Sequence, residues 1–408
     1  MTNSTQQAAP VAPPADPGNG SATSARLRAI IGELAARYLE RTSVVKVLVS
    51  CMLAGEHSLI LGPPGTAKSE VARDLTGRIH GAQYWEILLS KYADPKRMFG
   101  PIDVAALMKG DYQQVWDGRA TRADIAFIDE IFKCGPAALN ELLALLNERL
   151  YHPESGGAPI RCPLISAITA SNELPADENS AVYDRLLVRI EVGYLADPSN
   201  FTQLLRSATT PAAPPAAPTT VLLADLQTAV QTHVPRIDVP DPILEALCTL
   251  RAALRHAGLI ASDRRWKKSV RLLQAAAYLD GRGHVTPDDL AMLVHVLWDR
   301  PADRPTVERE VLQLVNPHSR AALDLLDGIE ELNTQLDAMA GQGREDLSNW
   351  AIQEANGKLA RAGSKLKDLR DQSQAAGRST TTLDEVLDRH RAVHTRIMTE
   401  ALGFNVSI

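Results

Sequence analysis

The sequence predicts an α/β fold with a parallel sheet between helices, followed by an all-α domain and a C-terminal helical extension. Two apolar runs, 58–61 and 124–130, are typical of buried parallel strands, and each ends in residues that carry chemistry. From about residue 222 the pattern is helical. We therefore expect an α/β core at 25–206, a Pro- and Ala-rich linker at 207–221, an all-α domain at 222–305 and a helical bundle at 306–408.

The first 24 residues are rich in Ala, Pro, Ser, Thr, Gly and Asn and hold almost no large apolar side chain. Such a segment cannot bury enough surface to offset the entropy of ordering, so residues 1–24 are expected to form a disordered tail. The core then begins with two helices around residues 40–42. The apolar face of the first helix is formed by Leu27, Ile30, Ile31, Leu34 and Tyr38.

The strand at 58–61 runs into a glycine-rich loop that ends in Lys-Ser and opens a helix. Glycines let consecutive backbone N–H groups turn onto phosphate oxygens, and the helix N-terminus adds its positive dipole end. Lys68 would reach the β- and γ-phosphates, and the hydroxyl of Ser69 would bind Mg²⁺. The predicted nucleotide-binding residues are Gly62, Pro63, Pro64, Gly65, Thr66, Ala67, Lys68 and Ser69.

Ala67 stands where this loop motif usually has its second glycine. A methyl group is small enough for close approach to phosphate, but it disfavours a positive φ. We therefore expect the loop to use an ordinary backbone conformation at Ala67.

The run 124–130 ends in two adjacent carboxylates, Asp129 and Glu130. The carboxyl ends of parallel strands form the edge where α/β proteins bind ligands. Asp129 can hold Mg²⁺ through water, and Glu130 can polarise an attacking water. The alternative is that both acids stabilise the start of the following helix. Coupled to the loop that ends at Lys68, they favour ATP hydrolysis, with ATP and Mg²⁺ as cofactors.

Longer motifs carry a family resemblance. The runs 127–140, 146–149, 170–175, 183–190 and 262–268 together resemble the MoxR branch of AAA+ ATPases, and within it the RavA-type members. The resemblance covers roughly residues 25–300. It implies an AAA+ P-loop core, an all-α lid at 222–305, and a helix-2 insert near 102–123 that faces the pore of a ring.

The resemblance also assigns roles to single residues. Asn172 stands at the sensor 1 position, where an amide orients the lytic water, although a loop-capping role is the alternative. Arg185 matches the arginine finger that enters the neighbouring subunit's site, and Arg189 could exchange roles with it. A surface salt bridge of Arg185 with Asp184 or Glu191 is the plainer interpretation.

Arg265 matches the sensor 2 position, with Arg264 as the alternative, and from there it would touch the γ-phosphate. A basic surface patch at 264–268 is the competing interpretation. In the insert, Tyr112 and Trp116 could grip a substrate chain, and simple packing is an equal alternative.

The function implied is that of a homo-oligomeric ring, expected to be a hexamer, which hydrolyses ATP to remodel, activate or assist the maturation of a partner protein. Family members commonly act with a von Willebrand A-domain protein. One alternative is a DNA-acting motor, which would need basic pore-facing residues, and only Lys109, Arg119 and Arg122 are obvious in the insert. The other is an ATP-dependent assembly switch with low turnover, which the presence of Glu130 disfavours.

Composition limits the other classes of protein to which the chain could belong. The chain has 408 residues, 45% of them hydrophobic, and a net charge of −6. It contains no apolar run near the twenty residues that span a bilayer, and its first residues lack a basic segment followed by an apolar one. We expect a cytoplasmic protein with no membrane insertion and no general nucleic-acid binding. The four cysteines have no metal-like spacing and are expected to be reduced thiols.

Overall fold

The computed structural model describes residues 17–153, 158–175, 180–209, 217–339, 344–375, 378 and 380–402. The chain divides into two compact units. The first comprises residues 1–245 and 260–302, and the second comprises residues 246–259 and 303–408. Most of the segment expected as the lid therefore belongs to the first unit, together with the nucleotide-binding core.

A five-stranded parallel sheet forms the centre of the first unit, which confirms the predicted fold class. The predicted strands at 58–61 and 124–130 lie within it and are buried, as their apolar sequences require. In spatial order the strands are β3 (Tyr84–Leu88), β4 (Ile125–Asp129), β7 (Ser166–Ser171), β1 (His57–Leu61) and β8 (Leu186–Glu191).

The register of the strands decides which loops can meet. Leu61 at the end of β1 pairs with Ser171, and Leu88 pairs with Asp129, so the loops that follow β1, β4 and β7 leave from one carboxyl edge. At the opposite, amino edge, His57 pairs with Leu186, the first residue of β8. Residues just before β8 therefore lie at the edge away from the glycine-rich loop.

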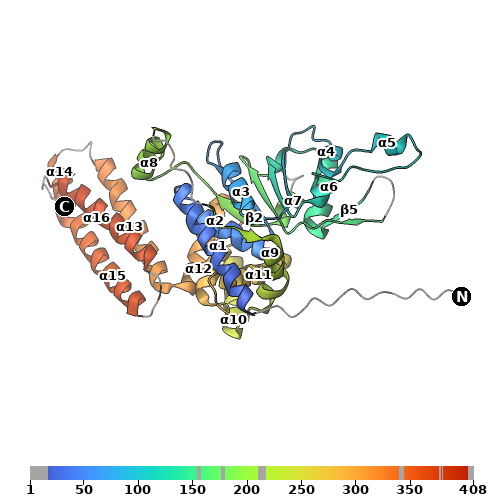
Figure 1. Cartoon of the computed structure of the whole chain (residues 1–408). Helices are drawn as coiled ribbons and strands as arrows, with labels where there is room; N and C mark the ends of the chain where they lie inside the picture. The colour runs from blue at the N-terminus through green and yellow to red at the C-terminus, as the bar shows by residue number, and fades with distance from the viewer. Residues whose placement is uncertain are drawn as a thin grey trace. The chain divides into compact units, whose positions relative to one another are not determined.

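Helices cover the sheet. α2 (Thr42–Leu53) packs on β1, β7 and β8, and α3 (Lys68–Gly77) packs on β4 and β7 (Figure 1). Around them lie α1 (Pro17–Arg37), α6 (Pro136–Glu148), α7 (Ser180–Arg185), α9 (Leu223–Thr228) and α11 (Asp263–Leu279). The shorter elements of this unit include β2 (Ile79–His80), α4 (Pro95–Phe99), α5 (Val104–Leu107), β5 (Leu150–Tyr151), β6 (Ile160–Arg161), α8 (Pro198–Thr209), β9 (Val221–Leu222) and the 3₁₀ helices η2 (Ile131–Lys133) and η6 (Pro287–His295).

The expected boundaries of the tail and the linker need correction. α1 begins at Pro17, so residues 17–24 are helical rather than disordered. The reason is tertiary packing: Ser24 is buried, and the hydroxyl of Tyr278 on α11 donates to the carbonyl of Gly20 at 2.8 Å. Within the expected linker, α8 continues to Thr209 and Val221 pairs in a strand. Residues 1–16 and 210–216 lie outside the described part.

The second unit is helical, as its sequence pattern predicts. Its long helix α13 (Pro317–Met339) packs against α15 (Asn356–Ala375) and α16 (Thr381–Glu400). Leucines repeating at helical spacing on these helices, among them Leu332, Leu359 and Leu383, form its core. The other helices are α12 (Arg304–Val315) and α14 (Arg344–Trp350), while α10 (Asp241–His256) runs across the boundary of the two units. Among the described residues, none of the helices combines the length and apolarity that crossing a membrane requires.

Candidate nucleotide site

The glycine-rich loop joins β1 to α3 and has strict steric demands. A Cβ atom added at Gly62 would lie 2.1 Å from the carbonyl oxygen of Val192, so only glycine allows the loop to pass the end of β8. Gly65 has a φ of +80°, in the region that favours glycine. These two positions shape a concave backbone turn immediately before the helix N-terminus, the arrangement that receives phosphate groups.

Ala67 does not follow the expectation of an ordinary backbone. Its φ is 62° and its ψ is 20°, a left-handed conformation, at the N-cap of α3. The geometry of the motif outweighs the preference of the residue, because the carbonyl of Ala67 must accept the first helical hydrogen bond, from the N–H of Val71 at 3.0 Å. The methyl group then costs about 1 kcal/mol relative to glycine.

Lys68 turns back along the loop that precedes it. Its ammonium group donates to the carbonyls of Gly62 at 2.6 Å and Pro63 at 2.8 Å, and to Oδ1 of Asn172 at 2.8 Å. Burial lowers the pKa of Lys68, while the nearby carboxylates of Asp129 and Glu130 act in the opposite direction. The structure thus brings Lys68, the loop and the predicted sensor 1 residue together.

The two acids at the end of β4 occupy different positions. The Oδ2 atom of Asp129 lies 3.4 Å from the hydroxyl of Ser69, so two hard oxygen donors face each other beside the loop. These are the ligand types that Mg²⁺ prefers, and one or two such protein ligands are usual for a magnesium ion that also binds phosphate. The residues therefore fit the predicted metal.

Glu130 lies next, with a left-handed φ of 54°. Its Oε1 atom accepts from the side-chain amide of Asn172 at 2.7 Å and lies 3.3 Å from the ammonium of Lys133. Its Oε2 atom is buried and has no hydrogen-bond partner among the described residues. Asn172 therefore bridges Lys68 and Glu130, and one carboxylate oxygen keeps its capacity to accept a proton.

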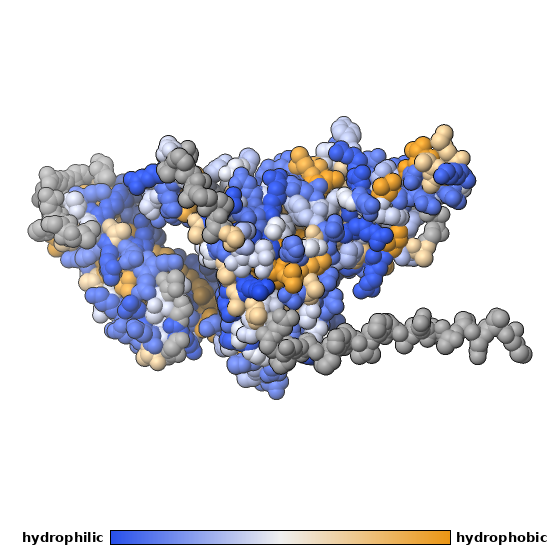
Figure 2. Space-filling model, in the orientation of Figure 1, coloured by the Kyte–Doolittle hydropathy of each residue, from blue (hydrophilic) through white to orange (hydrophobic). Residues whose placement is uncertain are grey.

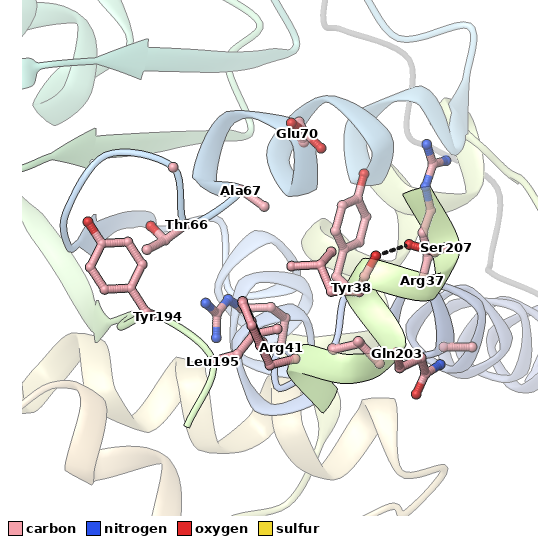
Figure 3. Close-up of a pocket in the computed structure, with 15 residues that line it drawn as sticks. Arg37, Tyr38, Arg41, Thr66, Ala67, Glu70, Tyr194, Leu195, Gln203 and Ser207 are labelled. Carbon is pink, nitrogen blue, oxygen red and sulfur yellow. Dashed lines mark hydrogen bonds between the residues drawn. The ribbon is translucent and has the colours of Figure 1, made fainter. Parts of the chain in front are cut away.

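A cavity of about 710 Å³ opens beside the loop (Figure 3). Figure 3 shows Thr66 and Ala67 of the loop on one side, Arg41 and Tyr194 below them, and Gln203 and Ser207 on α8 opposite. The sequence interpretation did not include Tyr194 or α8 in the site. A signal existed for Tyr194, which follows the carboxyl end of β8, the edge where ligands bind.

Arg185 lies far from this loop. It ends α7 just before β8, at the amino edge of the sheet, and donates to the carbonyl of Ala181 at 3.1 Å. Asp184, the expected surface partner, is 3.8 Å away. The structure therefore separates Arg185 from the loop residues of its own chain.

Arg189 cannot exchange roles with Arg185. Only 1% of its side chain is exposed, and it bonds to Asp299 and to the carbonyls of Trp298 and Tyr183. The expectation that it could act as the finger is wrong, because a buried and paired guanidinium cannot enter a neighbouring subunit.

The position of Arg265 also differs from expectation. Its side chain is 3% exposed and bonds to Asp299 at 3.0 Å, and not to the glycine-rich loop. The start of α11 lies at the amino edge, as the ion pair of Lys268 with Glu56 shows. The alternative residue, Arg264, bonds to Asn147 on α6. In this structure neither arginine reaches the predicted γ-phosphate position of its own chain.

The insert aromatics take different roles. Trp116 packs edge-on against Tyr151, with ring centroids 5.7 Å apart, so it follows the packing interpretation. Tyr112 is 40% exposed. More exposed apolar side chains lie close by on α5 and its end, where Val104, Leu107 and Met108 form an apolar tip, visible in Figure 2 at the place of α5 in Figure 1.

A parallel sheet with a glycine-rich loop, paired acids and an asparagine at one edge, followed by a helical lid segment, defines a P-loop ATPase of the AAA+ class. Comparison with known proteins agrees. Residues 25–229 match the family described as the MoxR domain in the MoxR-vWA-beta-propeller ternary systems, and residues 242–311 match an AAA lid domain. The chain belongs to the MoxR family of AAA+ ATPases.

Relatives cover most of the chain. Two uncharacterized proteins of Methanocaldococcus jannaschii are 32% and 31% identical over 370 residues, which span 89% and 88% of this chain and 94% and 95% of theirs. A crystal structure of an inferred ATPase from Cytophaga hutchinsonii is similar with a TM-score of 0.59 and 17% identity, covering 73% of this chain and 97% of that one. This last similarity supports the fold alone.

Proposed function

We propose that this chain forms a ring that hydrolyses ATP in order to remodel, activate or assist the maturation of a partner protein. The observation that carries the proposal is the placement of the expected catalytic residues at opposite edges of one sheet. Lys68 and Glu130 lie at the carboxyl edge, whereas Arg185 lies at the amino edge. Five strand residues span about 16 Å, so a second copy of the chain would have to supply Arg185.

The chemistry follows from the contacts at the carboxyl edge. Lys68 would exchange its bonds to loop carbonyls for phosphate oxygens. Asn172 would position the attacking water beside Glu130, whose Oε2 atom can take the proton as general base. Bound Mg²⁺ would offset phosphate charge, with Ser69 and Asp129 as its protein ligands.

A protein client suits the insert better than DNA does. The apolar tip exposes 67% of Val104, 48% of Leu107 and 85% of Met108, which suits contact with a polypeptide. Of the basic residues that a DNA motor would need, Arg119 is already engaged with the carbonyl of Arg97. The description of the matched family supports a von Willebrand A-domain partner. The RavA-like branch and the six-subunit ring stay predictions.

The first test is the ATPase rate per molecule as protein concentration rises from nanomolar to micromolar, with Mg²⁺ present and no added partner. A steep rise is expected, because a site completed by a neighbour works only in the assembly. A rate that stays constant and above background would contradict the proposal, since each chain would then be self-sufficient.

Mixing variants tests the role of Arg185 directly. Arg185→Ala and Lys68→Ala should each lose ATPase activity by about a hundredfold or more. In a mixture, a Lys68→Ala chain offers an intact finger to the intact loop of an Arg185→Ala chain, so part of the activity should return. If the mixture stays inactive although the chains co-assemble, Arg185 does not act in trans.

A further inference from the structure

Two buried guanidinium groups share one exposed carboxylate where β8 and α11 pack together. Arg189 on β8 and Arg265 on α11 are 1% and 3% exposed, and both bond to the same Oδ1 atom of Asp299, at 2.6 and 3.0 Å. Both also donate to the carbonyl of Trp298. One carboxylate thus joins two guanidinium groups that come from different elements.

The balance of charge makes the Asp299 carboxylate essential to the contact between the two arginines. Nε of Arg189, and Nε and Nη2 of Arg265, have no hydrogen-bond partner in the part of the chain that the structure describes. Two buried cations are therefore held by a single anion and two carbonyls, Trp298 and Tyr183. The Asp299 side chain itself is 63% exposed, so its carboxylate stays partly hydrated, but the two guanidinium groups are buried. Removing the negative charge would leave them without this partner, and the surrounding elements would move to hydrate them.

The cluster reaches the helix that carries Arg185. The ring of Tyr183 lies against the guanidinium of Arg189, 3.5 Å from its centroid, and its hydroxyl donates to the carbonyl of Asp299 at 2.5 Å. Tyr183 and Arg185 share the six-residue helix α7. A second contact joins α7 to α11, since the hydroxyl of Ser262 lies 3.4 Å from Asp184. The short helix is thus held from α11 and from Asp299.

We propose that Asp299 is a positioning residue for Arg185. By holding Arg189, Arg265 and Tyr183 in one cluster, it fixes the direction in which α7 presents Arg185 and ties that direction to α11. The inference rests on the proposed function of Arg185 in a neighbouring site. It also gives Arg265 a role that does not require contact with nucleotide of its own chain.

The test uses Asp299→Asn in the full-length chain, which keeps the shape and removes the charge. ATPase activity should fall at least tenfold, while the affinity for a fluorescent ATP analogue should stay within twofold of the unmodified chain, because the loop is untouched. Asp288→Asn is the matched control, an exposed carboxylate on η6, and should leave both quantities unchanged. Unchanged ATPase activity in Asp299→Asn would overturn the proposal.

Mixing variant chains distinguishes a positioning role of Asp299 from structural damage elsewhere in the chain. Lys68→Ala chains should rescue Asp299→Asn, because they supply an intact finger to its intact loop, whereas Arg185→Ala chains should not. If Lys68→Ala rescues Arg185→Ala but not Asp299→Asn, the inference fails and the proposed function stands. If it rescues neither, although the chains co-assemble, the role of Arg185 in trans fails and the inference falls with it.

A milder variant covers the case in which Asp299→Asn does not fold. Tyr183→Phe removes the hydroxyl bond to the main-chain carbonyl of Asp299 and keeps the ring on Arg189. It should lower ATPase activity a few-fold, with rescue by Lys68→Ala and not by Arg185→Ala. Full activity of Tyr183→Phe in that case would overturn the proposal.

Discussion

At the carboxyl edge of the sheet a relay of side chains keeps an acceptor atom open, whereas at the amino edge Arg149 and His57 bond to the main chain. Lys68, Asn172 and Glu130 form a side-chain relay that leaves one carboxylate oxygen without a partner among the described residues. Arg149, at the other edge, donates to the carbonyls of Gly55 and Leu164, each at 2.9 Å, and to that of Leu146. The first arrangement keeps bonding capacity for a ligand, and the second uses it to join loops.

The buried histidine of the amino edge, His57, also uses its bonding capacity on the main chain. The Nδ1 atom of His57 accepts from the N–H of Ala167 at 2.8 Å, so Nε2 carries the proton and donates to the carbonyl of Leu146 at 2.8 Å. Both nitrogens are engaged with backbone, which leaves no atom for acid–base chemistry. Histidine and arginine are common catalytic residues, but His57 and Arg149 are structural because they bond to the main chain.

The largest expected effect is on the ATPase rate, and it should distinguish the carboxyl edge of the sheet from the amino edge. Glu130→Gln should lower kcat by about a hundredfold or more, since it removes the general base, while nucleotide affinity should be retained. Glu56→Gln at the amino edge breaks the ion pair with Lys268 and should leave the ATPase rate per folded molecule unchanged. Steady-state ATPase assays with binding titrations measure both. Normal hydrolysis by Glu130→Gln would show that another group acts as the base.

The second effect is on the free energy of unfolding, which substitutions at the amino edge should change. Arg149→Met should lower the free energy of unfolding by about 3 kcal/mol, because the three shorter of its carbonyl bonds, to Gly55, Leu146 and Leu164, are lost at about 1 kcal/mol each. Arg161→Met, an exposed arginine on β6, is the matched control and should change stability by less than about 0.5 kcal/mol. Urea unfolding followed by circular dichroism measures the difference. Equal midpoints for the two variants would contradict a framework role for Arg149.

The third effect is a pH dependence that only the amino edge should show. Burial sets the pKa of His57 well below its usual value of about 6.5. At pH values between the pKa of His57 in the folded chain and its pKa in the unfolded chain, the unfolded chain binds more protons than the folded one. Stability should therefore fall as pH drops below about 6.5. One such group contributes up to about 1.4 kcal/mol per pH unit.

Unfolding midpoints at pH values from 7.5 to 5.5 test this. His57→Gln should be less stable than the unmodified chain at neutral pH but should lose less on acidification. His80→Gln, which removes an exposed histidine on β2, should keep the original slope. A slope that is the same in His57→Gln would assign the acid sensitivity to other groups.

Local sequence predicted the carboxyl edge well, because its residues follow strands whose ends must meet. The glycine-rich loop, Asp129 with Glu130, and Asn172 each stand at the end of a buried strand or directly after it, and the sheet register brings them together. The amino edge was not predictable in this way. The partner of Arg189 and Arg265 is Asp299, which follows them by 110 and 34 residues and carries no motif of its own.

Other misses came from packing that composition does not reveal. Residues 17–24 have the composition of a tail, yet they are helical because α11 offers Tyr278 to bond to the carbonyl of Gly20. α8 was not expected to line the cavity beside the glycine-rich loop. Its Phe201 and Leu204 are about half exposed, and a short apolar face of this kind does not indicate which surface it will meet.

The smallest effect tests the strained backbone at Ala67, beside the carboxyl edge. Ala67 holds a φ of 62°, so Ala67→Gly should relieve about 1 to 2 kcal/mol of backbone strain. Part of this gain is offset by the greater freedom of glycine in the unfolded chain, which leaves a net stabilisation below about 1 kcal/mol. Ala54→Gly, where φ is −71°, should instead destabilise. Thermal melting of both variants measures the two effects. Destabilisation by Ala67→Gly would mean that the loop does not hold Ala67 in the left-handed region.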